Sequence, residues 1–378
     1  MRIAAACCAA IAVLPLGAPR APFPPPPPPP SPSTDYRILV ASESGDLVTQ
    51  LRWDGAALTT VTTVPVGVMP ADIDGAHNVA AAPDGSAWYV SIAHGTPYGS
   101  LWKFAAGSDS LLGRARAELF PTTIALTPDG RLAFVANSDF HGDHPRTNVV
   151  TIVETGTMTT LTQLPTCDMP HGVKVNHAGT RVYVSCMHSD ELLEIDRQSF
   201  RILRRRRTGG AAGHAGAGAG PGMHGTAPAP SQAPVCSPTY VALSPDDRRL
   251  YVACNQANTL QVLDAETFAL IRTVPVGAGA YNVEASPDGR WVLVTNKKAQ
   301  SVSVVDAATL VEVARIATSK PLPHGVAYAP DGSVAFVTAE SVGADAGAVD
   351  VMDLVTRRRL FSHPLPRQPT GVAVLVEP

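Results

Sequence analysis

The sequence predicts an all-β fold, a seven-bladed β-propeller with four antiparallel strands per blade, from three observations. An alternating apolar stretch, a turn of the Pro-Asp-Gly type and a second apolar stretch recur six times. Alternation with a period of two around a tight turn is typical of a β-hairpin. Successive turns are 45, 49, 68, 42 and 43 residues apart, and a period of about 40–45 residues is typical of propeller blades. The turns lie at Pro83, Pro128, His177, Pro245, Pro287 and Pro330.

The six hairpins supply the first two strands of six blades. One hairpin cannot bury both of its faces, so neighbouring units must stack in a ring. A third strand that ends in an acid and then a fourth strand follow the hairpin, as residues 260–264 and 270–274 illustrate. The first strand and turn of the six hairpins span residues 79–85, 124–130, 173–179, 241–247, 283–289 and 326–332.

The seventh blade is expected to combine both ends of the chain. Residues 370–376 match an inner strand, whereas residues 37–42 match the second strand of a blade. We therefore expect these two segments to pair, which closes the ring without a free sheet edge.

Composition predicts the parts outside the propeller. Residues 1–20 resemble a secretory signal peptide, and residues 21–35 form a stiff proline-rich spacer. A lipid-modified Cys7 or Cys8 is the alternative to cleavage. The propeller then covers residues 36–378, with a Gly-, Ala- and Pro-rich insertion at 208–234 that we expect to be disordered. These features predict a periplasmic or secreted protein, with tethering to the envelope as an alternative.

Charge and hydropathy exclude two classes of partner. Charged residues make up 16% of the chain and the net charge is −3, so we expect no nucleic-acid partner. No run of 18 apolar residues occurs, so we expect no transmembrane segment in the mature protein.

The ends of the second strands, such as 134–137 (FVAN) and 293–296 (LVTN), resemble the YVTN-repeat (YncE-like) family of seven-bladed propellers. The resemblance covers residues 36–378 and implies the fold more than a function. The wider group includes exported proteins of unknown role, lactonases and relatives of the propellers of nitrite and nitrous oxide reductases. The chain departs from the family at the terminal Asn, which is replaced by Cys186, Cys254, Ala339 and Ser42.

Histidines gather at one end of the predicted ring. His77, His171 and His324 occupy the same repeat position, at the start of an inner strand. Seven blades would separate them by roughly 103°, 154° and 103° around the channel mouth. Three neutral imidazoles with an open position would suit a catalytic metal ion. The alternative is that the position needs only a hydrogen-bonding cap, because Thr122, Thr239, Tyr281 and Thr370 fill it in the other blades.

Further candidate ligands lie at the same end. The loops between second and third strands carry four more histidines, and two loops between blades carry cations that could hold an anionic ligand. The four candidate metal ligands are His94, His188, His141 and His144, and the two cations are Lys320 and Arg367.

The four cysteines of the predicted domain form two equivalent pairs. Cys167 precedes an inner strand whose partner ends at Cys186, and Cys236 stands in nearly the same relation to Cys254. Antiparallel pairing brings such positions together, so the sequence predicts disulfides 167–186 and 236–254 in an oxidising compartment. Free thiols and thiolate ligands of copper or zinc are the alternatives.

Three function classes follow. The first is a non-catalytic cell-envelope protein that recognises a small-molecule or protein ligand at the channel mouth. The second is a metal-dependent oxidoreductase or metal-handling protein, with copper or another transition metal as cofactor at the histidines. The third, a lactonase-like hydrolase, rests on fold analogy alone.

Overall fold

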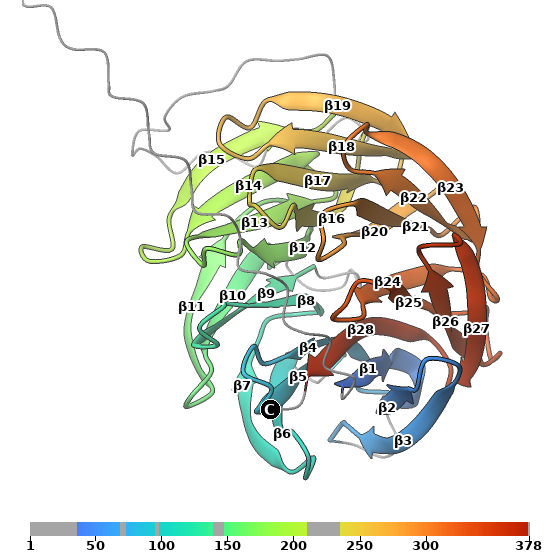
Figure 1. The fold of residues 1–378 in the computed structure, drawn as a ribbon. Coiled ribbons are helices and arrows are strands. Elements are labelled where there is room, and N and C mark those ends of the chain that lie inside the picture. Colours follow the sequence, from blue (N-terminus) through green and yellow to red (C-terminus); the bar gives the residue numbers. More distant parts are fainter. Residues whose placement is uncertain (1–35, 69–72, 95–97, 139–146, 210–234, 377–378) are drawn as a thin grey trace, which may run out of the picture.

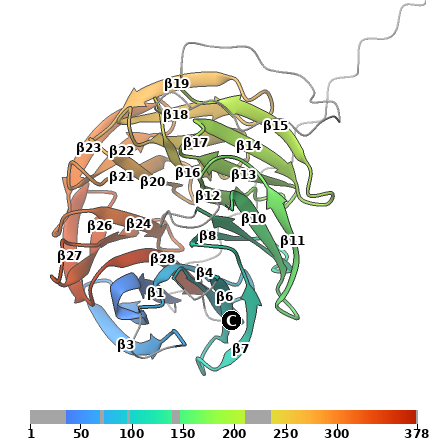
Figure 2. The same cartoon turned by 180° about the vertical axis from the view of Figure 1, so that it is seen from behind.

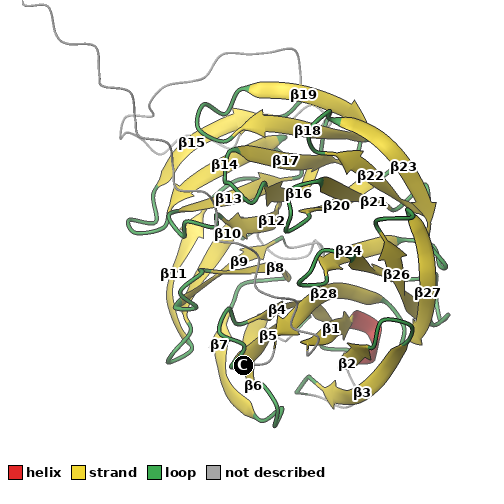
Figure 3. Ribbon diagram, in the orientation of Figure 1, coloured by secondary structure: helices red, strands yellow, loops and turns green. Residues whose placement is uncertain are grey.

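A computed structural model describes residues 36–68, 73–94, 98–138, 147–209 and 235–376. Seven four-stranded antiparallel sheets surround a central axis, as predicted (Figure 1). Apart from a single 3-10 turn, η1 (Glu43–Gly45), the described elements are strands (Figure 3). The predicted signal peptide, spacer and most of the insertion lie outside the described residues.

Each blade runs from an inner strand at the axis to an outer strand at the rim. In that order the first four blades are β28 (Pro369–Val376), β1 (Tyr36–Ser42), β2 (Leu47–Trp53), β3 (Leu58–Pro65); β4 (Ala76–Ala81), β5 (Ala87–Ile92), β6 (Ser100–Ala105), β7 (Leu111–Arg116); β8 (Pro121–Leu126), β9 (Leu132–Asn137), β10 (Val149–Glu154), β11 (Thr159–Pro165); and β12 (Pro170–Val175), β13 (Arg181–Cys186), β14 (Glu191–Asp196), β15 (Ile202–Arg207). The last three are β16 (Pro238–Leu243), β17 (Arg249–Cys254), β18 (Thr259–Asp264), β19 (Leu270–Pro275); β20 (Ala280–Ala285), β21 (Trp291–Asn296), β22 (Ser301–Asp306), β23 (Val311–Ala317); and β24 (Pro323–Tyr328), β25 (Val334–Ala339), β26 (Gly347–Asp353), β27 (Arg358–Leu365).

The ring closes where the two ends of the chain meet. Strand β28 pairs with β1 in antiparallel register, for example Leu39 opposite Ala373. The red and blue strands lie side by side in both views (Figures 1 and 2). Closure by the terminal strands is therefore confirmed, and it gives the seventh blade an inner strand that the chain supplies last.

The core lies between neighbouring blades, where the two faces of each sheet pack on the next sheet. Middle strands are buried on both faces: every residue of β21 and β25 is buried. Large aromatic rings fill the wider gaps, and Trp88 stacks on Phe104 with ring centroids 4.1 Å apart. Outer strands instead consist mostly of exposed and half-buried residues, because they form the rim of the ring.

The insertion leaves the propeller between β15 and β16, and one residue, Asp190, holds both of its ends. The carboxylate of Asp190 accepts hydrogen bonds from the backbone N–H groups of Val235, Cys236 and Ser237. The carbonyl of Asp190 accepts a bond from Thr208 N at 2.7 Å. The chain therefore leaves and re-enters the ring at the same place.

No helix in the part of the chain that the structure describes is long and apolar enough to cross a membrane.

Candidate functional site

The second residue of every inner strand points to the propeller axis and is buried. The seven residues at this position, called the axial column below, are His77, Thr122, His171, Thr239, Tyr281, His324 and Thr370. They include all three histidines that the sequence analysis placed in one repeat position. His171 is fully buried, and His324 and His77 are 1% and 5% exposed.

Hydroxyl groups link the blades at this level. Where the column residue is Thr, its hydroxyl donates to the column carbonyl of the next blade: Thr122 to His171 (3.0 Å), Thr239 to Tyr281 (2.5 Å) and Thr370 to His77 (2.6 Å). Where the column residue is His or Tyr, a Ser or Thr on the second strand replaces that hydroxyl. It donates from Ser185 to Thr239 (2.6 Å), from Thr295 to His324 (3.1 Å) and from Thr338 to Thr370 (2.6 Å).

The hydroxyl links change how the column is understood. In blades with Thr in the column, the matching second-strand residue is Ala136, Ala253 or Ala41. The three column threonines therefore do act as hydrogen-bonding caps of the next blade. In the other four blades a Ser or Thr occupies this position. The links from Thr295 and Thr338 leave Tyr281 and His324 without a capping role, whereas His171 Nδ1 still donates to the Thr239 carbonyl of the next blade.

The histidine and tyrosine side chains of the column meet in one aromatic cluster. The ring centroids of His77 and His324 lie 5.5 Å apart, and those of His324 and Tyr281 lie 4.7 Å apart. His171 contacts Tyr281 at 5.5 Å, and Tyr240 contacts His171 at 5.0 Å. The three histidines thus belong to one cluster, in which Tyr281 contacts both His171 and His324.

Hydrogen bonds fix the tautomer of His171. Its Nδ1 lies 3.1 Å from the carbonyl oxygen of Thr239, which can only accept, so Nδ1 carries the proton. Its Nε2 then accepts from the Tyr281 hydroxyl at 3.1 Å. Burial lowers the pKa of His171 to about 3, with further contributions from His77 and Lys297. This imidazole is therefore neutral at ordinary pH.

Glu43, in η1, binds two histidines. Its carboxylate oxygens lie 2.8 Å from His77 Nδ1 and 3.0 Å from His94 Nε2. Burial opposes ionisation of Glu43, but the charges and hydrogen bonds of the two imidazoles outweigh it and hold the pKa of Glu43 well below its usual range. Gly75 makes room for this arrangement, because a Cβ there would lie 2.2 Å from the His94 ring.

A second carboxylate lies beside His324. Glu340 Oε1 is 3.9 Å from His324 Nε2 and 2.5 Å from Lys297 Nζ. The Lys297 ammonium also lies 3.9 Å from the centroid of the Tyr281 ring, a cation–π contact. Burial, with the nearby Lys297, His77 and His171, holds the pKa of His324 well below its usual value.

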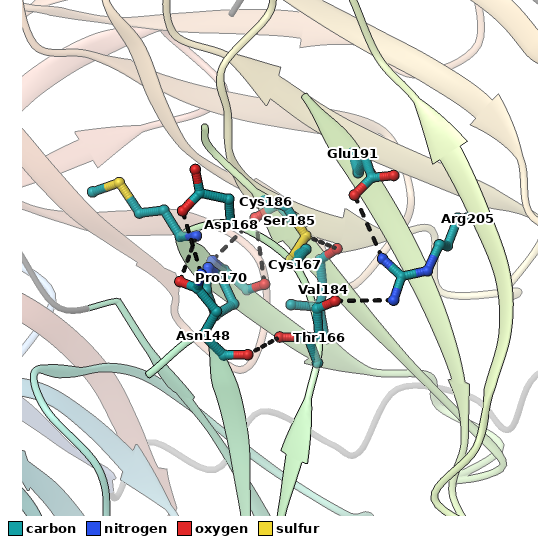
Figure 4. Close-up of a disulfide and its surroundings, with 12 residues drawn as sticks. Asn148, Thr166, Cys167, Asp168, Pro170, Val184, Ser185, Cys186, Glu191 and Arg205 are labelled. Carbon is teal, nitrogen blue, oxygen red and sulfur yellow. Dashed lines mark hydrogen bonds and ion pairs between the residues drawn. A yellow bond between two sulfur atoms is a disulfide. The ribbon is translucent and has the colours of Figure 1, made fainter. Parts of the chain in front are cut away.

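The disulfides position two of the entry loops, and both predicted pairs are present. Cys167 is joined to Cys186 and Cys236 to Cys254, with Cα–Cα distances of 6.0 and 4.5 Å. Around the first, Asn148 binds the backbone of Thr166 and Met169, and Arg205 donates to the Thr166 carbonyl (Figure 4). The loops so fixed lead directly into the strands that carry His171 and Tyr240.

Among the described residues, His188, Lys320 and Arg367 do not join the cluster. His188 is 42% exposed and lies 3.9 Å from Asp168, and His141 and His144 lie outside the described residues. Lys320 is half-buried before β24, and Arg367 is exposed beside Gln368, which contacts Glu43. Among the residues that the structure describes, no three His, Cys, Asp or Glu side chains are arranged to hold a metal ion. The three-histidine metal site is therefore not formed in this part of the chain, since both His171 nitrogens have other partners.

Sequence analysis missed Glu43, Lys297, Glu340, Tyr240 and Phe120. The first three share one repeat position, the residue directly after the second strand, so the repeat alignment could have found them. Phe120, which contacts His77 and His94 at 5.2 and 5.1 Å, precedes its inner strand with a positive φ of 48°. The residue before the inner strand has a positive φ in all seven blades, and it is a glycine in two of them, Gly75 and Gly279, so the repeat alignment could have indicated this conformation.

Comparison with known proteins supports the fold and adds a direction for function. The family model of the cytochrome d1 heme domain matches residues 239–359, which include Tyr240, Tyr281 and His324. No curated protein sequence matches the chain.

Several solved structures share the fold. The periplasmic gluconolactonase PpgL of Pseudomonas aeruginosa (17% identical, TM-score 0.69) covers 91% of this chain and is itself covered to 99%. For hydrazine synthase of Kuenenia stuttgartiensis (17% identical, TM-score 0.62), the match covers 81% of this chain and 92% of the synthase chain. For the dihydro-heme d1 dehydrogenase NirN, solved in complex with DHE (15% identical, TM-score 0.56), the match covers 92% of this chain and 77% of the NirN chain.

Proposed function

We propose that this protein is a periplasmic binding protein of the YVTN-repeat type, which holds a heme-type ligand at the axial end formed by the column. The observation that carries the proposal is the aromatic cluster of the column, in which His77 and His324 each keep a buried ring nitrogen without a hydrogen-bond partner in the described structure. The match of residues 239–359 to the cytochrome d1 heme domain supports the choice of ligand, because that stretch supplies three members of the cluster. The two disulfides support an oxidising compartment.

The donor set fits such a ligand. Imidazole is a common axial ligand of heme iron, and His77 Nε2 and His324 Nδ1 are buried without a hydrogen-bond partner in the described structure. Phe120 and Tyr281 offer apolar rings beside them, and Arg367 could pair with an acidic substituent. The bound group would supply redox chemistry, and the chain would bind and orient it.

Titration of the purified protein with heme, followed by the Soret absorption band, tests this proposal. We expect saturable binding that His324→Ala weakens at least about tenfold, since one metal–ligand contact is lost. His177→Ala is the matched control, because His177 pairs with Asp247 in a turn at the opposite end. Absence of binding, or an equal effect of both variants, would refute a heme site at this end.

A lactone hydrolase is the second candidate, and the Glu43–His77 pair favours it. Glu43 holds Nδ1 of His77, which leaves the buried Nε2 without a hydrogen-bond partner in the described structure and suits a general base. In this role Nε2 would take a proton from water as the water oxygen attacks the lactone carbonyl, and would return it to the ring oxygen as the ring C–O bond breaks. Hydrolysis of gluconolactone by the wild type and its loss in both His77→Gln and Glu43→Gln would select this function over heme binding.

A further inference from the structure

We propose that His77 and His324 together bind one divalent first-row transition-metal ion, with the remaining coordination positions open to solvent or to a ligand. The proposal does not rest on a heme-type ligand or on hydrolysis. It replaces the three-histidine site with a two-histidine site, and it assigns His171 to the walls of the cluster.

The rings have the separation that a shared ion requires. Their centroids lie 5.5 Å apart and their planes are inclined by 83°. With metal–nitrogen distances of about 2.0–2.1 Å, two imidazoles on one ion have centroids about 5–6 Å apart. The backbone brings them this close because only the closing blade, with inner strand β28, separates β24 from β4.

One nitrogen on each ring needs a partner. His77 Nε2 and His324 Nδ1 are both buried and make no hydrogen bond within the described structure. A buried polar atom left unpaired costs about 1–3 kcal/mol, so two of them on neighbouring rings favour a ligand that satisfies both. A metal ion does so, because neutral imidazole nitrogen is a preferred donor for zinc, cobalt, nickel and copper.

Carboxylates stand at the opposite nitrogens. Glu43 Oε2 lies 2.8 Å from His77 Nδ1, and Glu340 Oε1 lies 3.9 Å from His324 Nε2. Histidine ligands of metals almost always donate their second N–H to such a group, which orients the ring and raises its basicity. His171 also donates one N–H, to the Thr239 carbonyl, but its Nε2 already accepts from the Tyr281 hydroxyl and is not available to a metal ion.

Titration with cobalt(II), followed by its visible absorption bands, and calorimetric titration with zinc test the proposal. We expect His77→Gln and His324→Gln each to lower zinc affinity at least about tenfold and to abolish the cobalt bands. Glu43→Gln should lower affinity about 10- to 100-fold, because it removes only the supporting carboxylate. His177→Gln, at the far end, should change nothing, which also accounts for metal bound by other surface histidines.

Thermal unfolding of each metal-free variant shows whether it is folded. If His77→Gln does not fold, His324→Gln and Glu43→Gln carry the test. Two results would overturn the proposal: wild-type protein without cobalt bands, or a His171→Gln variant that loses binding as completely as the other two. Zinc binding without heme binding would support this site while refuting the proposed heme function. Heme binding that survives His77→Gln, in a variant that has lost zinc binding, would show that the heme function does not depend on this metal site.

Discussion

At the second position of each inner strand, two solutions satisfy one hydrogen-bonding requirement. A carbonyl near the axis accepts a hydroxyl donated by the preceding blade, and that hydroxyl comes either from a column threonine or from the second strand. A column Thr is always matched by Ala on the second strand, and a column His or Tyr is always matched by Ser or Thr there. The second-strand position follows the column position by 14 in residue number in the six blades whose chain is continuous. A histidine or tyrosine can therefore occupy the column while the hydrogen bond between neighbouring blades is kept.

A double-mutant cycle tests this pairing. Thr338→Ala removes the hydroxyl that binds the Thr370 carbonyl and the Gly325 N–H, and should destabilise the fold by about 1–3 kcal/mol. His324→Thr in the same blade restores a column hydroxyl. The double variant should therefore lose less unfolding free energy than the two single variants lose together. Urea unfolding measures the difference. Strict additivity would contradict the substitution of one hydroxyl for the other.

Buried neutral histidines should make the protein sensitive to acid. The pKa of His171 is lowered to about 3, mainly by burial, whereas an unfolded histidine titrates near 6.5. Between about pH 6.5 and 3 the unfolded chain therefore binds a proton that the folded chain does not, so stability falls as pH falls. The loss is up to about 1.4 kcal/mol per pH unit for each such histidine. Unfolding free energies in urea across this window should show the slope, and His171→Phe should flatten it. An equal slope in wild type and variant would assign acid sensitivity elsewhere.

The repeat position of the histidines could be predicted from sequence, but their partners could not. Alignment of the blades placed His77, His171 and His324 at one end, and the structure brings them to the axis. Whether an imidazole nitrogen is available depends on neighbours from other blades, such as Thr239 and Tyr281 for His171. Those contacts arise from ring closure, which no local pattern encodes.

Each outer strand carries a β-bulge at the same place, and this protects the rim. In every blade one extra residue interrupts the pairing of the third and fourth strands, and its side chain is an exposed aliphatic with 38–56% of its surface accessible. Bulges bend an edge strand away from the straight geometry that intermolecular pairing needs. The bulge residues are Val61, Leu112, Leu161, Leu203, Ile271, Val313 and Leu360.

Removal of one bulge should promote association. Deleting Leu161 places Thr160 and Thr162 in regular register opposite Val153 and Ile152. The straightened edge of β11 should then pair between molecules, seen as an increase in light-scattering mass with concentration. Leu161→Thr keeps the bulge and removes the apolar side chain, so it should remain monomeric. Association of this control instead of the deletion would assign the effect to the side chain.

Closure by β28 is the other element on which the ring depends. Deleting Pro369–Val376 removes the inner strand of one blade and exposes the edge of β1. It also removes the hydroxyl of Thr370, which binds the His77 carbonyl. We expect a large fall in melting temperature and aggregation in size-exclusion chromatography. A truncated protein that stays monomeric with an unchanged melting temperature would contradict this dependence.

For the molecule as a whole, periodicity predicted nearly everything that the backbone does. Blade number, strand order, closure and both disulfides follow from repeat spacing and alternation, because a propeller repeats one local solution and its contacts are between neighbours. The axial site is different, since it joins side chains from β4, β12, β20 and β24 with the turn η1. A repeat analysis treats these as equivalent positions, and only the assembled ring shows which of them touch.

The insertion is the one break in this periodicity, and its position predicts that it can be removed. Excluding the 25 residues 210–234 reduces the 68-residue spacing between turns to 43, within the range of 42 to 49 residues of the other repeats. A Cβ on Gly209 would lie 3.0 Å from the Val235 Cβ, so the two ends of the segment are adjacent. Asp190 binds the chain on both sides through Thr208 and residues 235–237.

Replacing residues 210–234 with a two-residue Gly-Ser linker should therefore leave the melting temperature, the disulfides and zinc binding at His77 and His324 unchanged. Asp190→Ala in the shortened chain should destabilise it, because three backbone N–H groups lose their acceptor and each unmade bond costs about 1–3 kcal/mol. Thermal unfolding by circular dichroism compares the three proteins. Loss of folding on excision alone would show that the insertion contributes to the ring rather than interrupting it.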